Sequence, residues 1–362
     1  MIDDIRTLGR AAATRHAALP KAARRALHVA KRLHFLSSYG PGLWRQAAAK
    51  APAVPSGERL RQLLAGFDPL EAGWYVQARG HVGGCVSNLH REEYLKGVNG
   101  QFGHVLDNKY LFALVAEQLG IPHPRLFGLA RDGRWRWLDG GREALERDLA
   151  NGGRVVLKPN LGKKGSEVSI IRDMGAFERG GRGEMIATAF VQQAGYAGAI
   201  HAGSLNTIRL LTIRPGADQD AFVAAAMHRF GAAATGPVDN FSAGGLVAEV
   251  DLNSGELSSA ARIGPGNLLQ FGPDHPDSGV CIEGVHVPWW DEAKALVLRL
   301  CDMLPQLDYV GWDVAITEQG PVVIEGNSHP SLRFFQLYRS LLSDPRVAAF
   351  LAARAIEVPR SS

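Results

Sequence analysis

The stretch YVGWDVAITEQGPVVIEGNSHPS, residues 309–331, decides the fold of this 362-residue chain. Two apolar runs flank a short TEQG segment, a pattern typical of two strands that pair antiparallel through a turn. That pairing predicts that Asp313 and Glu325 lie close together. Because side chains alternate across a strand, Glu325 and Asn327 should point the same way. The hairpin therefore predicts that two carboxylates and an amide oxygen converge at one strand end.

Oxygen ligands of this kind are those that Mg²⁺ prefers, with substrate phosphates completing its coordination. We therefore take Asp313, Glu325 and Asn327 as candidate metal ligands. The alternative is a capped strand end whose acidic side chains are solvated.

Other segments outside this hairpin also have regular patterns. A strand, a glycine-containing loop and a second strand are expected over RVVLKPNLGKKGSEVSII, 154–171. Further strands are expected within 204–214, 221–231 and 244–257, and a helix over 288–305. Helices and strands alternate from about residue 104, and antiparallel hairpins dominate the second half. This pattern predicts an α+β fold.

The segment DNKYLFALVAEQLG, 107–120, is expected to form a helix with Asp107 near its N-cap and Gly120 just past its end. Lys109 falls in the first turn, where a cation opposes the helix dipole, so it is a candidate for ligand binding. A solvated lysine is the alternative. The apolar face is expected to consist of Tyr110, Leu111, Leu114, Val115 and Leu119.

Two further cations stand out in strand-like segments. Lys158 ends a predicted strand next to the loop GKKGSE, whose small residues would let backbone N–H groups approach phosphate oxygens. No Walker A or G-x-G-x-x-G motif occurs, and an ordinary hairpin tip is the alternative. Arg209 lies in an apolar strand, where a buried guanidinium needs an anionic partner.

A polar loop and three histidines complete the candidates. DNFSAGG, 239–245, offers Asn240 and Ser242 before a double glycine, with a plain loop tip as the alternative. Candidate substrate-side histidines, for which structural roles are favoured, are His201, His228 and His329.

The N-terminal 50 residues differ from the rest in charge. They hold ten Lys/Arg against two aspartates, in a chain whose net charge is only +4. Pro20 is expected to divide two helices, with Ala26, Leu27, Ala30 and Leu33 on one side. The segment either packs on the body as a solvated basic helix or contacts an anionic membrane surface or acidic partner. Residues 51–58 have the composition of a linker.

The overall composition excludes several classes of protein. The small net charge does not favour a nucleic-acid partner. We expect no secretory signal and no spanning helix, since no apolar run reaches the roughly 18 residues that one needs. The three cysteines are widely spaced and odd in number, which predicts reduced thiols and a cytoplasmic location.

In their order along the chain, six stretches resemble the ATP-grasp superfamily and its sugar-transfer associated branch, which is related to the alpha-L-glutamate ligases. These stretches are LDNKYLF, VVLKPNLGKKGSEV, NTIRLLT, VDNFSAGG, YVGWDVAIT and VVIEGNSHPS. The resemblance covers roughly 104–340. It implies a two-lobed ATP-grasp domain (104–345) with its hinge near 188–193. Together with the composition, this divides the chain into a basic helical region (1–50), a linker and preceding segment (51–103), that domain, and a C-terminal helix and tail (346–362).

The resemblance also implies roles for individual residues, with ATP clamped between two α+β lobes. Arg209 and Lys158 would act in catalysis, with Arg209 facing the γ-phosphate or an acyl phosphate. The metal ligands named above would hold one or two Mg²⁺ ions. The nucleotide would be bound by Lys109, Lys158, Gly162, Lys164, Gly165, Ser166, Phe190, Val191 and Asn240.

The hinge departs from the family pattern. The stretch IATAFVQQ, 186–193, has Thr188 and Ala189 where acidic residues are common. Adenine can still pair with hinge backbone, and Gln192 or Gln193 would substitute in ribose recognition.

The activity implied is ligation of a carboxylate to an amine through an acyl phosphate, on a sugar-linked or envelope-polysaccharide substrate. A kinase and a non-catalytic nucleotide-binding accessory of polysaccharide assembly stay open as alternatives. The basic segment would place the protein at the inner membrane surface or on an envelope-assembly partner.

Overall fold

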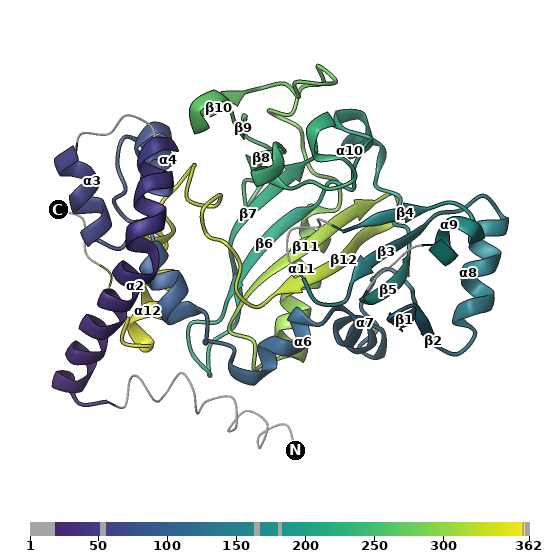
Figure 1. Ribbon diagram of the computed structural model, residues 1–362, viewed down its shortest axis with the longest axis horizontal. Helices are drawn as coiled ribbons and strands as arrows, with labels where there is room; N and C mark the ends of the chain where they lie inside the picture. Colours follow the sequence, from purple (N-terminus) through teal and green to yellow (C-terminus); the bar gives the residue numbers. More distant parts are fainter. Residues whose placement is uncertain (1–18, 51–55, 163–166, 180–182, 357, 359–362) are drawn as a thin grey trace.

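The computed structural model describes residues 19–50, 56–162, 167–179, 183–356 and 358. The described residues form two antiparallel sheets and a group of helices at one end of the molecule (Figure 1). The five-stranded sheet has the order β2-β1-β5-β3-β4, and the seven-stranded sheet has the order β10-β9-β8-β7-β6-β11-β12. The α+β class expected from the sequence is therefore confirmed.

The smaller lobe is built on the five-stranded sheet. Its elements are β1 (Leu126–Arg131), β2 (Arg134–Trp137), α8 (Gly141–Ala150), β3 (Val155–Pro159), β4 (Ser169–Ile171), α9 (Met174–Arg179) and β5 (Glu184–Ala189). Its core is a separate cluster in which Trp135 and Trp137 stack and Phe177 packs beside both rings. The predicted pairing of 154–171 is confirmed, since β3 and β4 are antiparallel neighbours.

The larger lobe is built on the seven-stranded sheet. It contains β6 (Ile208–Ile213), β7 (Phe222–Phe230), β8 (Leu246–Glu249), β9 (Ala260–Ile263), β10 (Leu269–Gly272), α11 (Trp290–Met303), β11 (Tyr309–Thr317) and β12 (Gly320–Asn327). One face of the sheet packs on α11 through residues such as Leu210, Trp312 and Val297. The strands and the helix predicted for this half of the chain are therefore confirmed.

The opposite face of this sheet is covered at one end by helices from both ends of the chain (Figure 1). The helices outside the two lobes are α2 (Lys21–Lys50), α3 (Ser56–Leu64), α4 (Pro69–Arg79), α5 (Asn88–His90), α6 (Gly103–Asp107), α7 (Lys109–Gln118), α10 (Gly195–Ile200) and α12 (Pro345–Ala353). A π-helical turn spans Arg91–Leu95, and 3-10 turns span Gly100–Phe102, Ala233–Thr235, Phe241–Ala243, Pro265–Asn267 and Leu341–Ser343.

Along this covered face the side chains change from apolar to polar. On β6, Leu211 and Ile213 pack against the helices, whereas Arg209 does not belong to that apolar cluster. On β11, Tyr309 is in the same apolar cluster and Asp313 is polar. The polar end of this face is therefore the part of the large sheet that can contribute to a site.

The helix α2 begins directly after Pro20, as predicted, but its buried face is not the predicted one. Leu33 is 62% exposed, whereas His28 shares a 2.6 Å hydrogen bond with Tyr94, and the Lys31 ammonium lies 3.9 Å from the centre of the same ring. The long cationic side chain covers apolar surface better than the small alanines do, so the face that packs is rotated. Of the linker predicted over 51–58, residues 56–58 already belong to α3 and the remainder lie outside the described residues.

The helix α7 also differs from its prediction in detail. Asn108, not Asp107, is the N-cap, and its side chain accepts a hydrogen bond from the Leu111 N–H. Gly120 follows the helix with φ +62°, as a C-terminal glycine should. The buried residues are Phe112, Ala113 and Ala116, while Leu111 is 44% exposed. The face is displaced because α7 packs against both β1 and β12, so it has two partners rather than one.

Within the described residues no helix is long and apolar enough to cross a membrane. Cys85, Cys281 and Cys301 are all free thiols.

Candidate functional site

The polar end of the large sheet brings together residues from three adjacent strands. In the register of the sheet, Asp313 on β11 lies opposite Arg209 on β6 and opposite Glu325 on β12. A bulge follows Asp313, because Val314 pairs with Val323 and Ile324 is left over. The predicted proximity of Asp313 and Glu325 is therefore confirmed, and the bulge lies directly beside it.

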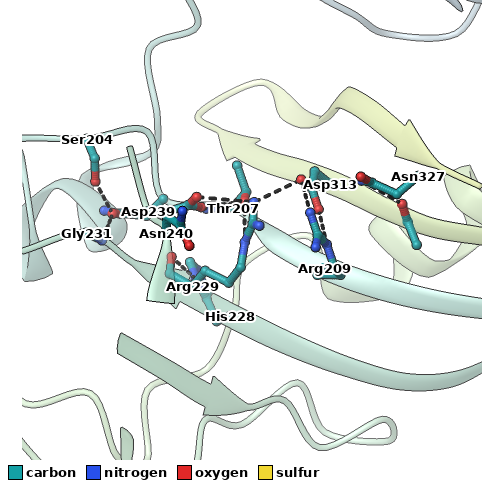
Figure 2. Close-up of polar contacts among 12 residues, drawn as sticks. Ser204, Thr207, Arg209, His228, Arg229, Gly231, Asp239, Asn240, Asp313 and Asn327 are labelled. Carbon is teal, nitrogen blue, oxygen red and sulfur yellow. Dashed lines mark hydrogen bonds and ion pairs between the residues drawn. The ribbon is translucent and has the colours of Figure 1, made fainter. Parts of the chain in front are cut away.

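Asp313 accepts hydrogen bonds from two arginines, as Figure 2 shows. Arg209 binds it in a bidentate manner, with Nε to Oδ1 and Nη2 to Oδ2 both at 2.6 Å. Arg229 on β7 donates to the second oxygen at 2.9 Å. Burial alone would raise the pKa of Asp313, but the two guanidinium groups overcome that effect and hold its pKa well below the usual range. Asp313 is therefore a carboxylate at every physiological pH.

Arg229 extends the network to Thr207 and Asp239 (Figure 2). Its Nη2 lies 2.5 Å from Thr207 Oγ1 and 3.2 Å from Asp239 Oδ1. Thr207 in turn donates to Asp239 through its backbone N–H at 2.9 Å and through its hydroxyl at 2.5 Å. Burial raises the pKa of Asp239 even though Arg229 opposes the change. Sequence reasoning missed Arg229 and Asp239, although an arginine within the apolar AFVAAAMHRFG run carries the same signal that singled out Arg209.

The lysines Lys109 and Lys158 both lie near Glu325. Lys109 Nζ is 3.9 Å from Glu325 Oε2 and donates to the Gly162 carbonyl at 2.9 Å. Lys158 is buried, and among the described residues no hydrogen bond or ion pair holds its ammonium group. Burial lowers the pKa of Lys158, with Glu325 and Asp313 opposing the change and Lys109 adding to it. The two lysines that the sequence selected are therefore neighbours in one electrostatic cluster.

A small cavity lies between the lobes at this cluster. Its lining includes both lysines, Thr188 from β5 and Ile324 from the bulge. His123 also lines it, and burial lowers the pKa of this histidine, so it is neutral near pH 7. The sequence analysis did not identify His123 as a candidate site residue.

Asn160, directly after β3, fixes the start of α7 relative to the small sheet. Its carbonyl accepts from the Lys109 N–H, its amide oxygen accepts from the Tyr110 N–H at 2.8 Å, and its amide nitrogen donates to Glu184. These bonds hold the backbone of Lys109 beside the strand that carries Lys158.

The segment predicted to be the hinge, 188–193, runs from the end of β5 towards α10. Arg154 lies 3.6 Å from the centre of the Phe190 ring and donates to Gln192 Oε1 at 2.6 Å. Gln193 is buried, and its amide bonds to the backbone of His201, Ser204 and Asn206. Gln193 is thus committed to holding a loop, whereas Gln192 is bonded to Arg154.

The oxygen ligands expected to bind Mg²⁺ fit that ion unequally. Asn327 donates its amide N–H to the Gly311 carbonyl at 3.3 Å, which leaves its amide oxygen available (Figure 2). Glu325 is partly exposed. Among the described residues its one ion pair is with the Lys109 ammonium, 3.9 Å away. Asp313 accepts three guanidinium hydrogen bonds, so it has the least capacity left. Glu325 and Asn327 therefore fit a hard cation best, with Asp313 in support.

The remaining predicted site residues are placed as follows. Asn240 lies beside the arginine network, and its side chain accepts from the Ser242 N–H at 3.0 Å (Figure 2). Lys164, Gly165 and Ser166 lie outside the described residues. His228 is fully buried, with its ring stacked on Phe230 and bonded to Tyr196, and burial lowers its pKa to about 3, which suits a structural residue.

Comparison with known proteins gives a family match and several distant structural likenesses. Residues 176–348 match the family model described as sugar-transfer associated ATP-grasp. That range contains Arg209, Asp313, Glu325 and Asn327, whereas Lys109 and Lys158 precede it. No curated protein matches the sequence.

Three solved structures illustrate the likenesses. The ATP-grasp ligase PsnB with a minimal precursor is 16% identical, with a TM-score of 0.38 over 69% of this chain and 62% of its own. N5-carboxyaminoimidazole ribonucleotide synthetase from Thermotoga maritima is 14% identical, with a TM-score of 0.38 over 72% and 52%. D-alanine–D-alanine ligase from Bacillus anthracis is 14% identical, with a TM-score of 0.39 over 72% and 70%. The chain thus spans 62% and 52% of the length of the first two.

The two antiparallel lobes and the family match define an ATP-grasp protein. Within that superfamily, residues 176–348, slightly less than half of the chain, match the sugar-transfer associated branch. The resemblance drawn from the ordered stretches of sequence is therefore confirmed.

Proposed function

We propose that this protein is an ATP-dependent carboxylate–amine ligase that works through an acyl phosphate. The observation that carries the proposal is Lys158: a buried side chain that lines the cavity between the two lobes, whose ammonium group has no hydrogen-bond or ion-pair partner among the described residues. An unpaired buried charge is costly unless an anion joins it. Lys109 lies near Glu325, and Arg209 and Arg229 bind Asp313. This cluster of cations therefore suits an anion with several charges, such as a triphosphate.

Each group has a distinct part in the proposed reaction. Lys158 and Lys109 bind and neutralise phosphate oxygens. The γ-phosphoryl group passes to an oxygen of the substrate carboxylate, which gives ADP and an acyl phosphate. The lone pair of an amine then attacks the acyl carbon, inorganic phosphate leaves, and the amine loses a proton to solvent. Mg²⁺, held by Glu325 and Asn327, would neutralise phosphate charge that develops during the transfer.

Arg209 and Arg229 are placed to stabilise charge on the transferred group. Both guanidinium groups are fixed on neighbouring strands by Asp313, so they need little reorganisation when charge develops. Arg209 is 13% exposed at its side chain and Arg229 is 14% exposed, whereas Asp313 beneath them is nearly inaccessible. Asp313 is therefore a positioning residue for the arginines as well as a supporting metal ligand in this proposal.

Nucleotide binding would require the lobes to separate. The cavity has a volume of about 10 Å³, which is room for about one water molecule and far too small for ATP. The hinge backbone at Phe190 and Val191 would then accept the adenine, and Gln192 would reach the ribose.

The substrate class is proposed from the branch of the superfamily. We infer a sugar-linked carboxylate or amine from envelope polysaccharide synthesis, met at the cytoplasmic side of the membrane. The basic helix α2 would provide weak attachment there.

ADP release tests the function and separates it from the alternatives. A ligase releases ADP only when a carboxylate and an amine are both present, a kinase needs one acceptor, and a non-catalytic accessory responds to neither. The matched pair of variants is Glu325→Gln, at the site, and Glu292→Gln, an exposed glutamate in the first turn of α11. ADP release that needs both substrates and is lost only in Glu325→Gln supports the proposal. Release without an amine, at the full rate, would contradict it.

A further inference from the structure

Two histidines and an aspartate converge outside the polar network already described. His201 follows α10, and His275 and Asp277 belong to a loop between β10 and α11. Each of the three offers a ring nitrogen or carboxylate oxygen, and these atoms lie within 4.8 Å of one another. The proposed ligase reaction uses none of the three.

The hydrogen bonds of His275 set its tautomer for metal binding. The residue is fully buried, and its Nε2 is 2.8 Å from the Gly231 carbonyl oxygen, which can only accept a hydrogen bond. The proton is therefore on Nε2, and Nδ1 carries the lone pair. The Asp277 N–H is a weak competitor for that lone pair, at 3.3 Å. A ligating histidine whose other nitrogen donates to a backbone carbonyl is the usual arrangement at metal sites.

His201 has a ring nitrogen that no hydrogen bond satisfies. Its Nε2 is buried and has no hydrogen-bond partner among the described residues. The ring is stacked on His275, with centroids 5.1 Å apart and planes 26° apart.

The backbone of His201 is held firmly, and Gly203 packs beside its ring. Its carbonyl accepts from the buried amides of Gln193 at 3.0 Å and Asn206 at 2.7 Å. Gly203 is adjacent: a Cβ at that position would lie 2.7 Å from His201 Nε2. The glycine therefore packs directly against the unsatisfied nitrogen, and a larger residue at this position would push the ring aside.

Asp277 provides the third ligand atom. One of its carboxylate oxygens, Oδ2, accepts from the Ala233 N–H at 2.7 Å, which orients the group, and the other oxygen remains available. The residue is exposed, so solvent can reach the cluster from its side.

We propose that His201 Nε2, His275 Nδ1 and a carboxylate oxygen of Asp277 bind a divalent transition-metal ion, Zn²⁺ being the best fit, with water completing a tetrahedral site. Two imidazoles and one carboxylate match the ligand types of zinc, whereas Mg²⁺ prefers an all-oxygen environment. The side chains must reorient on binding, because the ligand atoms lie within 4.8 Å of one another and the two rings are stacked, whereas zinc holds nitrogen and oxygen ligands at about 2.0–2.2 Å.

The ion would act as a clamp between two loops that support the catalytic network. His275 is bonded to Gly231, directly after the strand that carries Arg229, and Asn206 bonds both the Gly231 N–H and the His201 carbonyl. Cross-linking His201 to the 275–277 loop would therefore hold the segment that leads into Thr207 against the end of the strand that carries Arg229.

Zinc and cobalt titration of the full-length protein tests this site. Chelator-treated protein would be titrated with Zn²⁺ in millimolar Mg²⁺, and with Co²⁺ for the visible absorption of a four-coordinate ion. The variants are His201→Gln and Asp277→Asn, which remove ligands, and Gly203→Ala, which fills the space beside His201 Nε2. The matched control is His286→Gln, because this exposed histidine lies 3.7 Å from Glu256 and belongs to no three-ligand group among the described residues.

Wild-type protein should bind one Zn²⁺ per chain and show a rise in melting temperature with Zn²⁺, since binding to the folded state stabilises it. The three site variants should bind at least about tenfold more weakly and lose the cobalt absorption, whereas His286→Gln should match wild type. Melting of the metal-free variants shows that they fold. If His201→Gln fails to fold, Asp277→Asn and Gly203→Ala decide. Equal zinc affinity in wild type and Asp277→Asn, or equal loss in His286→Gln, would overturn the proposal without affecting the ligase assignment.

Discussion

Lys158 should act in opposite directions on nucleotide binding and on the stability of the free protein. Replacing it with methionine keeps most of the side-chain volume and removes the charge. The free protein then no longer buries an ammonium group that lacks a partner among the described residues, so the free energy of unfolding should stay the same or increase. The nucleotide, by contrast, no longer meets a cation at its phosphates, so its binding should weaken.

The size of the binding effect follows from the strength of a hydrogen bond between a charged donor and a phosphate oxygen. A hydrogen bond to a charged group contributes about 1.5–3 kcal/mol, which corresponds to a Kd for ATP increased by roughly 10- to 150-fold. The pH dependence has a definite sign as well. Because burial lowers the pKa of Lys158, the unfolded chain binds more protons than the folded one at alkaline pH below about 10.4, so this residue makes stability rise with pH there. The methionine variant should lose that rise.

Isothermal titration with ATP and urea unfolding at several pH values would measure both effects. Lys294→Met is the matched control, because this lysine has partners: the Leu252 carbonyl at 2.8 Å and Asp291 at 2.9 Å. It should lower the free energy of unfolding by about 0.5–1.5 kcal/mol and leave ATP binding unchanged. An unchanged ATP affinity in Lys158→Met would refute the nucleotide assignment. A large loss of stability in that variant would show that Lys158 is structural.

Three other changes give separate tests. Asp313→Asn leaves two buried guanidinium groups without their carboxylate, so the free energy of unfolding measured in urea should fall by about 3–5 kcal/mol. In the wild type, the contribution of Asp313 to stability should disappear as the pH falls from about 4 towards 2, because its pKa is depressed in the folded state. A loss below about 1 kcal/mol would mean that the arginines find other partners. Glu325→Gln should reduce ADP release by about a hundredfold or more with the melting temperature unchanged, whereas Glu292→Gln should keep wild-type turnover. Equal turnover in the two variants would rule out a role of Glu325 in metal binding. The double variant Arg24→Gln, Arg25→Gln on α2 should bind anionic liposomes about 30-fold more weakly at low salt, because each charge contributes about 1 kcal/mol. If the wild-type protein does not bind the liposomes, α2 only packs on the rest of the protein.

The sequence predicted those parts of the site that depend on local patterns. The TEQG turn allowed the pairing of Asp313 with Glu325 to be derived, because a short turn between two apolar runs leaves few registers. The bulge beside Asp313 was not foreseeable, since nothing in GPVVIEGN marks an extra residue. The reasoning that Arg209 needs an anion was sound, but a sequence does not say whether that anion is a ligand or a neighbouring aspartate.

The features that were missed depend on tertiary contacts. Asp239 is recruited to Arg229 by a loop, and His201 meets His275 across a long separation in sequence, so no spacing rule links either pair. The faces of α2 and α7 were misjudged for the same reason. Periodicity shows that a helix has two sides, whereas the neighbouring strands and helices decide how wide the buried side is.

Transfer of an oxygen atom from the carboxylate tests the central claim most directly. With a carboxylate substrate identified by ADP release and labelled with ¹⁸O in both oxygens, an acyl phosphate places one labelled atom in the inorganic phosphate that leaves when the amine attacks. Mass spectrometry of the phosphate should therefore show one ¹⁸O per phosphate for each amide formed. Amide formation with unlabelled phosphate would contradict the account, because the carboxylate oxygen would then never have been bonded to phosphorus.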